Sequence, residues 1–406
     1  MATLHHYVNQ VRGFIHGKNG DNLACLLTYQ DTNHSQSKWI LGNSHEDQLT
    51  VIKSPWDELV LSHLNVCFYI DEKDFIKAFQ EHVNVLQVFQ KILQGLKDEN
   101  WPLPVLSVIC RDLRLLARAA DEQTTRIRVS KAKETGTRVG LNKDENLEKA
   151  AEALMGVFRI CATDVRSTPE NSKKRGMITI VNQLFKIYYR INKLHLCKPL
   201  VRALDNADMM ELFPISEKVT YSYFLGMRSM YESSYKKAEL ELTYAFLHCS
   251  RNSYKNKRLI LIFLIPVKMI LGNMPKETIL EKYNLQVFSS LIQSVKEGNI
   301  RAFDESLKSG SEFFWKFGVF LILEKLRSIL YRNIFKKIYL ILNSIRIPME
   351  AFKIVLEKLQ GKGMTMEEVH CIVANLIYDN RIRGYISLPH QKLVVSKQNP
   401  FPPLSA

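Results

Sequence analysis

Residues 317–398 change their apolar period from helical to strand-like, and this order limits what the chain can fold into more than any other feature. After a helical pattern at 317–342, Pro348 stands at the first position of a short amphipathic helix that Gly361 ends. Thr365 and Glu368 match a capping box at the start of a second apolar stripe. Two short helices are therefore expected before the strands.

Strand-like alternation follows these helices. The runs 384–388 and 392–397 alternate with a period of two, and Pro-containing residues 389–391 turn the chain between them. A helix, a second helix and a β-hairpin in this order are typical of a winged helix, so 317–398 is predicted to form one. A Pro-rich tail, 399–406, follows.

Positive charge is concentrated in the same region. Lys and Arg number 56 against 41 Asp and Glu, a formal net charge of +15. Between Glu324 and Lys397 there are 13 basic and 6 acidic residues, so +7 of the excess lies there. This excess predicts a polyanionic partner, either nucleic acid or an acidic protein.

The second helix of the predicted winged helix is acidic. Its charged residues are Glu367, Glu368 and Asp379, which repel phosphates, and Asn375 is its single plausible reader of a base edge. Sequence-specific recognition is therefore disfavoured. The basic residues beside this helix predict contacts with the backbone of RNA or DNA; they are Lys336, Lys337, Arg381, Arg383, Lys392 and Lys397. The alternative is that these side chains only solvate the surface.

The N-terminal region, 1–122, has the pattern of amphipathic helices without a repeated strand signal. Its helices are expected at 4–15, 56–70, 75–93 and 105–120. Residues 123–146 combine many basic residues with two glycines and few large apolar groups, and are predicted to form a mobile charged linker. A solvated loop is favoured there over a segment that touches an anion.

Residues 147–316 are predicted to form helical repeats. In the segment 221–249, Gly226, Ala238 and Ala245 stand at offsets where a tetratricopeptide hairpin needs small residues. One such hairpin cannot bury its own apolar face, so it needs neighbours in a stack. The expected neighbours are 184–204, 259–271 and 288–307.

Signatures of enzymes, metal sites and membrane spans are absent from the sequence. No metalloprotease, serine-hydrolase or phosphate-loop motif occurs, so neither catalysis nor a cofactor is expected. The 11 His and 7 Cys are dispersed, without a C-x-x-C pair, which argues against a metal site and favours a reducing compartment. The longest apolar run, 259–267, is about half of the ~20 residues that cross a bilayer, so membrane insertion is not expected.

Helical repeats that run into a terminal winged helix resemble the PCI domain, found in subunits of the proteasome lid, the signalosome and an initiation-factor assembly. Four long runs are similar to one branch of this family, at 181–203, 255–272, 320–342 and 384–405. The resemblance implies an all-α superhelix of tetratricopeptide-like hairpins with a C-terminal winged helix. It also implies a non-enzymatic subunit of a nuclear complex that couples transcription to mRNA export at the nuclear pore.

The same resemblance implies two protein partners and a location. The partners are a large scaffold subunit resembling germinal-centre-associated nuclear protein and a small acidic, mostly disordered protein. The expected location is the nucleus, including the nuclear pore, with the cytoplasm as a second compartment. The alternative is a purely structural subunit of a lid-type assembly that does not bind nucleic acid.

A basic cluster within the predicted repeats is the expected site for the acidic partner. It consists of Arg251, Lys255, Lys257 and Arg258, between two helices of the stack. A disordered acidic chain would gain charge-assisted hydrogen bonds there.

Overall fold

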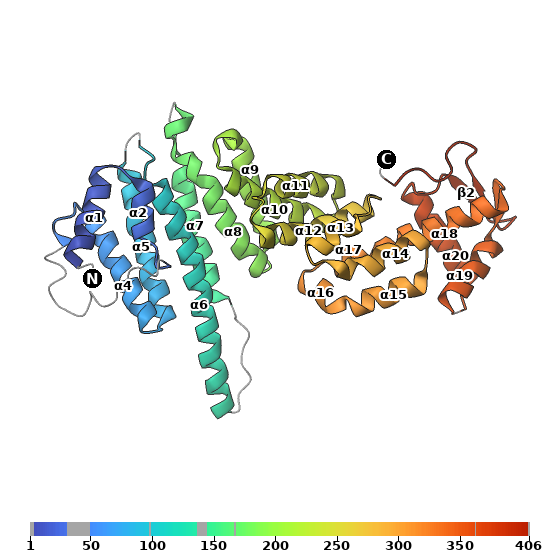
Figure 1. The fold of residues 1–406 in the computed structure, drawn as a ribbon, viewed down its shortest axis with the longest axis horizontal. Helices are drawn as coiled ribbons and strands as arrows, with labels where there is room; N and C mark the ends of the chain where they lie inside the picture. Colours follow the sequence, from blue (N-terminus) through green and yellow to red (C-terminus); the bar gives the residue numbers. More distant parts are fainter. Residues whose placement is uncertain are drawn as a thin grey trace. The chain divides into compact units, whose positions relative to one another are not determined.

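The protein divides into two compact units, an N-terminal unit, Met1–Tyr221, and a C-terminal unit, Ser222–Ala406 (Figure 1). The computed structural model describes residues 4–30, 49–96, 99–135, 144–165, 168–361 and 363–404. The division falls inside the helix α10 (Ile215–Tyr231), whereas the sequence suggested boundaries on either side of 123–146, after 316 and after 398.

The described part of the N-terminal unit consists of helices, as predicted. They are α1 (Leu4–His16), α2 (Gly20–Leu26), α4 (Trp56–Asp71), α5 (Phe75–Gly95), α6 (Leu103–Thr135), α7 (Glu145–Ala162), α8 (Met177–Arg190), α9 (Cys197–Ala207) and the start of α10, with short 3-10 turns between some of them. Helix α5 packs between α4 and α6, and α6 also packs on α7 and α8. Fully buried residues such as Leu59, Phe89 and Leu113 fill the spaces between these helices.

More than half of the segment predicted as a mobile charged linker is helical rather than a loop. Helix α6 runs for 33 residues to Thr135, and α7 begins at Glu145. The segment 105–135 contains neither Gly nor Pro, so the helix continues although its apolar stripe has ended. The rest of that prediction, 136–143, lies outside the described residues.

The repeat region of the C-terminal unit is also helical, as predicted. Its helices are the end of α10, α11 (Tyr235–His248), α12 (Tyr254–Ile270), α13 (Glu277–Lys282), α14 (Ser289–Glu297), α15 (Ile300–Ser309), α16 (Ser311–Lys316), α17 (Phe320–Glu324) and α18 (Leu326–Leu342). The predicted helix 317–342 is divided in two at Lys325. Gly298 adopts a left-handed conformation after α14, and Asn299 caps α15 by accepting from the Ala302 amide.

Small residues bring α10 and α11 close together, as the hairpin pattern predicted. A Cβ atom at Gly226 would lie 2.6 Å from the Leu242 side chain and 3.2 Å from the Leu242 backbone nitrogen. Ala238 is fully buried on α11. Larger side chains at these two positions would force the helices apart.

Replacing Ala238 by leucine is therefore expected to overpack this contact. The Ala238→Leu chain should lose about 1–3 kcal/mol of its free energy of unfolding, because a fully buried site has no room for the added carbons. Urea unfolding of the full chain measures the loss. Lys236→Leu, at an exposed position of the same helix, is the control; equal midpoints for the two variants would contradict the close approach.

A small sheet and two helices follow the repeats and form the predicted winged helix. The elements are β1 (Arg346–Pro348), α19 (Met349–Gln360), α20 (Met366–Tyr378), β2 (Gly384–Ser387) and β3 (Lys392–Val395). The strands are antiparallel in the order β1-β3-β2, and β1 was missed by the sequence analysis. Pro348 ends β1 and is the N-cap of α19 rather than its first residue. The capping box of Thr365 and Glu368 is confirmed.

The Pro-rich tail packs onto the C-terminal unit. Phe401 is buried, and its ring lies 5.5 Å from that of Tyr339. The buried guanidinium of Arg332 on α18 donates to the carbonyl oxygens of Phe401, at 3.2 Å, and Pro402, at 2.7 Å. The backbone nitrogen of Arg383, just before β2, donates to the Pro400 carbonyl at 2.9 Å. The tail therefore connects the wing with α18.

Candidate nucleic-acid and partner interface

Helix α20 presents no positive charge to a ligand. Val369, Val373 and Leu376 bury one side of the helix. Its exposed residues include Glu367, and Asn375 remains its single candidate for reading a base. The geometry therefore agrees with the interpretation that this helix does not read a sequence.

The six predicted phosphate-binding residues do not share one surface. Lys392 is exposed at the start of β3, Lys397 is exposed two residues past its end, and Lys336 is exposed on α18. The Lys337 ammonium donates to the Glu297 carbonyl oxygen at 2.6 Å, so it is directed toward the end of α14. Arg381 and Arg383 alone among the six line a cleft in the C-terminal unit.

Arg381 is the least accessible of the six. Its side chain is 18% exposed, and its Nε atom lies 4.0 Å from Asp379 Oδ2. Burial lowers the pKa of Arg381, while the Asp379 carboxylate and Tyr235 act in the opposite direction. The guanidinium keeps its charge at neutral pH, since an arginine pKa starts far above it. Arg381 can therefore add positive electrostatic potential to the cleft. Arg383 is exposed, so it can also contact a ligand directly.

The cleft has a volume of about 850 Å³ and brings together the repeats, the winged helix and the tail. Lys325, Arg327, Tyr235 and Tyr331 line it, and sequence reasoning missed all of them. Lys325 Nζ donates to the Tyr235 hydroxyl at 2.9 Å, and Arg327 pairs with Asp304 at 2.7 Å. No local motif identifies these residues, because they lie far along the chain from the wing and meet it only through packing.

Two of the four residues predicted to bind an acidic partner also donate hydrogen bonds within the chain. Lys257 is buried; its ammonium donates to the Phe246 carbonyl at 3.0 Å and lies 4.7 Å from the Phe246 ring centre. Arg258 donates to the Tyr283 carbonyl at 3.1 Å. Arg251 and Lys255 are exposed. Carbonyl acceptors hold Lys257 and Arg258, so Arg251 and Lys255 are the more accessible members of the predicted site.

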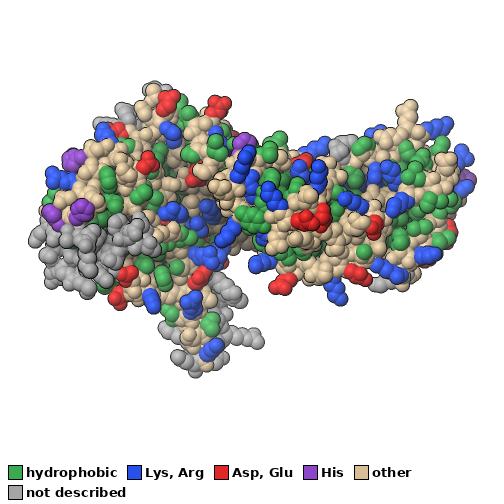
Figure 2. Space-filling view, viewed as in Figure 1, with side chains coloured by type: hydrophobic (Ala, Val, Ile, Leu, Met, Phe, Trp, Pro, Cys, Tyr) green, Lys and Arg blue, Asp and Glu red, His purple; other side chains and the backbone are tan. Residues whose placement is uncertain are grey.

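Exposed hydrophobic side chains lie on α11 and at the end of α18. Leu240 and Leu247 on α11 are each 68% exposed, and Leu340 and Ile341 on α18 are 62% and 81% exposed. Figure 2 shows hydrophobic and basic side chains intermingled on the visible face of the C-terminal unit. Neighbouring large hydrophobic side chains left in water are typical of protein-interaction surfaces.

Reversing the two exposed cations should weaken binding of an acidic partner. An Arg251→Glu, Lys255→Glu chain is expected to lose affinity for an acidic disordered protein, because both charge-assisted contacts become repulsive. Co-purification at several salt concentrations measures the loss. Lys282→Glu with Lys308→Glu, two exposed repeat positions, is the control; equal retention by both variants would place the acidic partner elsewhere.

The described residues offer neither a membrane span nor a metal site. Among the helices that the structure describes, none is long and apolar enough to cross a bilayer. The described part of the chain also brings no three His, Cys, Asp or Glu residues together in a way that could hold a metal ion.

The fold and these surfaces define a PCI-domain protein, and comparison with known sequences agrees. A sequence model of the PCI domain matches residues 273–397. PCI domain-containing protein 2 of Xenopus laevis is 46% identical over 403 residues, which cover 99% of this chain and 98% of the relative. The PCI domain-containing protein 2 homolog of Drosophila melanogaster is 40% identical over 406 residues, covering 100% and 99%. Protein CSN12 homolog of Schizosaccharomyces pombe is 32% identical over 362 residues, covering 86% and 84%.

The chain belongs to the PCI domain-containing protein 2 family. Its general role is that of a PCI-type scaffold subunit.

Proposed function

We propose that this chain is a non-enzymatic subunit that binds a protein scaffold and nucleic acid, in a nuclear complex coupling transcription to mRNA export through the nuclear pore. Family membership supports the scaffold part of this proposal. The resemblance of its long sequence runs to one branch of the PCI family, which implies an mRNA-export complex, supports the nuclear part. The winged helix would hold nucleic acid by its phosphates, while exposed apolar surfaces hold other subunits.

The observation that carries nucleic-acid binding is the distribution of charge in the winged helix. Helix α20 contains no Lys or Arg, whereas Arg383, Lys392 and Lys397 are exposed in the segment of the strands β2 and β3 that follows it. Basic side chains beside a helix that lacks base-reading residues favour contact with backbone phosphates, which are the same in every nucleic-acid sequence. The expected ligand is therefore nucleic acid of any sequence.

A specific observation also favours the second candidate, a purely structural subunit of a lid-type assembly. Leu340 and Ile341 at the end of α18 are largely exposed, close in the chain to the edge strand β1. A partner chain could cover this surface and use the winged helix only for assembly. The two functions differ in whether the assembled complex binds nucleic acid.

Fluorescence anisotropy of the chain purified with its scaffold subunit tests the proposal. The complex should bind labelled RNA or duplex DNA of unrelated sequences with similar affinity. Replacing Arg383, Lys392 and Lys397 by Gln should weaken binding to all of them. Replacing three exposed lysines of the repeats, Lys276, Lys296 and Lys308, by Gln is the matched control. A wild-type complex without affinity for any of these probes would favour the structural subunit.

The proposed complex is tested separately by its composition. Pull-down of the tagged chain from nuclear extract, followed by mass spectrometry, should recover a large scaffold subunit and a small acidic protein. Recovery of proteasome-lid or signalosome subunits in their place would support the structural alternative.

A further inference from the structure

Two helices of the N-terminal unit carry a row of five cations. Arg111, Arg114 and Arg118 follow one face of α6 at spacings of three and four residues, and Lys186 and Arg190 do the same on α8. Helix α6 packs on α8, and Arg114 Nε donates across to Gln183 Oε1 at 2.8 Å. We call these five residues the α6–α8 row.

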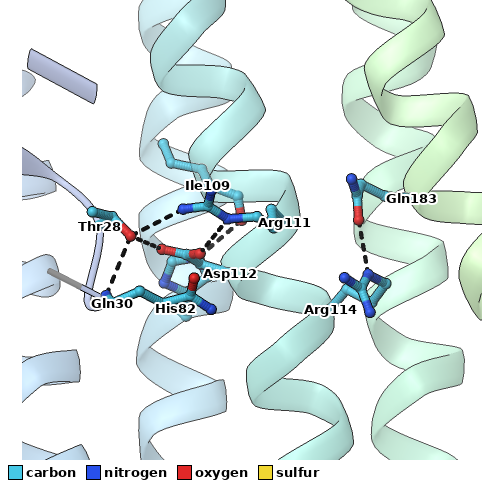
Figure 3. Close-up of polar contacts among 8 residues, drawn as sticks. All are labelled: Thr28, Gln30, His82, Ile109, Arg111, Asp112, Arg114 and Gln183. Carbon is cyan, nitrogen blue, oxygen red and sulfur yellow. Dashed lines mark hydrogen bonds and ion pairs between the residues drawn. The ribbon is translucent and has the colours of Figure 1, made fainter. Parts of the chain in front are cut away.

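The outer members of the row have acidic partners. Arg111 Nε lies 3.1 Å from Asp112 Oδ1, and Arg118 Nε lies 2.8 Å from Glu122 Oε1. Arg190 lies 3.9 Å from Glu122 and 4.0 Å from Asp144. Figure 3 shows Arg111 joined to Asp112 and to the hydroxyl of Thr28, while Arg114 extends toward Gln183.

The central members, Arg114 and Lys186, differ from the others. Both are partly buried, and within the described residues neither forms an ion pair with a carboxylate. Burial lowers the pKa of both side chains, and the nearby arginines lower it further. Glu217 favours the charged form of Lys186, but its carboxylate already accepts from Asn182 at 2.5 Å. Two half-buried cations that repel each other destabilise the fold unless an anion lies between them.

We propose that Arg114 and Lys186 form the centre of a second nucleic-acid-binding site, on the N-terminal unit, at which a backbone phosphate lies between the two side chains. This inference rests on the proposed function for its ligand. The arginine supplies a planar pair of donors and the lysine a point charge, a combination suited to a phosphate oxygen. Tyr29 lies within electrostatic range of Arg114 and offers a hydroxyl donor.

The shape of the row favours a phosphodiester chain over a compact anion. Arg111 and Arg118 are seven residues apart on one helix, which corresponds to about 10 Å along its axis. Exposed arginines thus continue the row on both sides of its half-buried centre: the side chains of Arg111, Arg118 and Arg190 are 41%, 51% and 45% exposed. A linear backbone can contact several of these cations at once, whereas a single phosphate reaches only the centre.

The test compares three variants of the full chain with labelled oligouridylate, by fluorescence anisotropy. Arg114→Gln with Lys186→Gln should weaken binding roughly 10- to 30-fold at 0.1 M salt, the effect of two lost phosphate contacts on a single strand. The exchange Arg114→Lys with Lys186→Arg keeps both charges and should restore most of the affinity. Lys198→Gln with Arg202→Gln, at exposed positions of α9 in the same unit, is the control.

Stability and chemical labelling give readouts that a structural role would not produce. Without nucleic acid, the Arg114→Gln, Lys186→Gln chain should melt close to the wild type, because relief of the repulsion offsets loss of the hydrogen bond from Arg114 to Gln183. Oligouridylate should raise the Tm of the wild type more than that of this variant. It should also protect Lys186 from acylation by an N-hydroxysuccinimide ester, read by mass spectrometry, whereas inositol hexakisphosphate should protect it less.

The outcomes separate this inference from the proposed function. If only the wing variant loses affinity, the winged helix binds nucleic acid and the α6–α8 row does not. If only the row variant loses affinity, the α6–α8 row binds nucleic acid and the winged helix does not. A lower Tm for the row variant with unchanged affinity makes the row structural and overturns the inference. Protection of Lys186 by inositol hexakisphosphate alone would overturn the nucleic-acid backbone as its ligand. A wild-type chain that binds no oligouridylate overturns this inference, whereas the proposed function is decided with the scaffold-bound complex.

Discussion

Neutralising Arg383, Lys392 and Lys397 together is expected to flatten the salt dependence of nucleic-acid binding by roughly 2 to 3 in the slope of log K against log salt. Each lost phosphate contact removes about 0.7 for a single strand and about 0.9 for a duplex. The loss should be similar for unrelated sequences, because the exposed cations lie in the strand region and helix α20 contains no Lys or Arg to read bases. Anisotropy titrations at several salt concentrations, with the scaffold-bound complex, measure the slope.

Two further substitutions refine this result. Arg381→Gln should add less than any of the three exposed positions, since its side chain is 18% exposed and lies beside Asp379. Lys336→Ala with Lys337→Ala should weaken nucleic-acid binding further only if these side chains are free to contact a phosphate. Lys337 already donates to the Glu297 carbonyl oxygen, so its contribution should be small. A loss confined to one nucleic-acid sequence would reinstate base reading and contradict the assignment to phosphates.

Replacing Arg332 by methionine should destabilise the C-terminal unit by about 2–4 kcal/mol. The substitution keeps an aliphatic side chain but removes the donors to the Phe401 and Pro402 carbonyls. Each buried polar group left without its partner costs roughly 1–3 kcal/mol. Burial and the nearby Arg381 lower the pKa of Arg332, and the relief of this repulsion offsets a part of the loss. Urea unfolding followed by tryptophan fluorescence measures the difference.

A second readout of this variant follows the tail itself. Limited proteolysis should release residues 399–406 from the Arg332→Met chain much faster than from the wild type, because the contact between the tail and α18 is weakened. Arg346→Met, at an exposed position on β1, is the control for a lost arginine. Equal rates of release in both variants would mean that Phe401 packing alone holds the tail.

The elements with strong local signals could be predicted from the sequence. The capping box at Thr365, the helix stop at Gly361 and the alternation in β2 and β3 each depend on neighbouring residues, so the winged helix was identified. Strand β1 was not, because three residues are too few to show a period. The strand is recognisable only through its pairing with β3, about 46 residues later, as in Ile347 with Leu393.

The candidate site was less predictable than the fold. The sequence identified a concentration of positive charge, but it could not say which cations face solvent. Lys257, Arg258 and Lys337 are held by backbone carbonyl groups of other elements, and such acceptors leave no trace in the sequence pattern. Conversely, Lys325 and Arg327 border the cleft with Arg381 only because the repeats pack against the winged helix.

The length of α6 has a consequence for hydrogen exchange. Figure 1 shows its C-terminal end extending past the neighbouring helices, and Gln123 accepts from the Phe75 amide near the last of these packed turns. Beyond it, Ile127 and Val129 are 42% and 40% exposed, and Arg128 forms a surface ion pair with Glu145. Amide hydrogens within 126–135 should therefore exchange with deuterium orders of magnitude faster than those within 105–120, although both segments belong to one helix. A partner that binds the projecting end would slow this exchange. The exchange rate of 126–135 therefore measures whether a partner is bound to this end of α6.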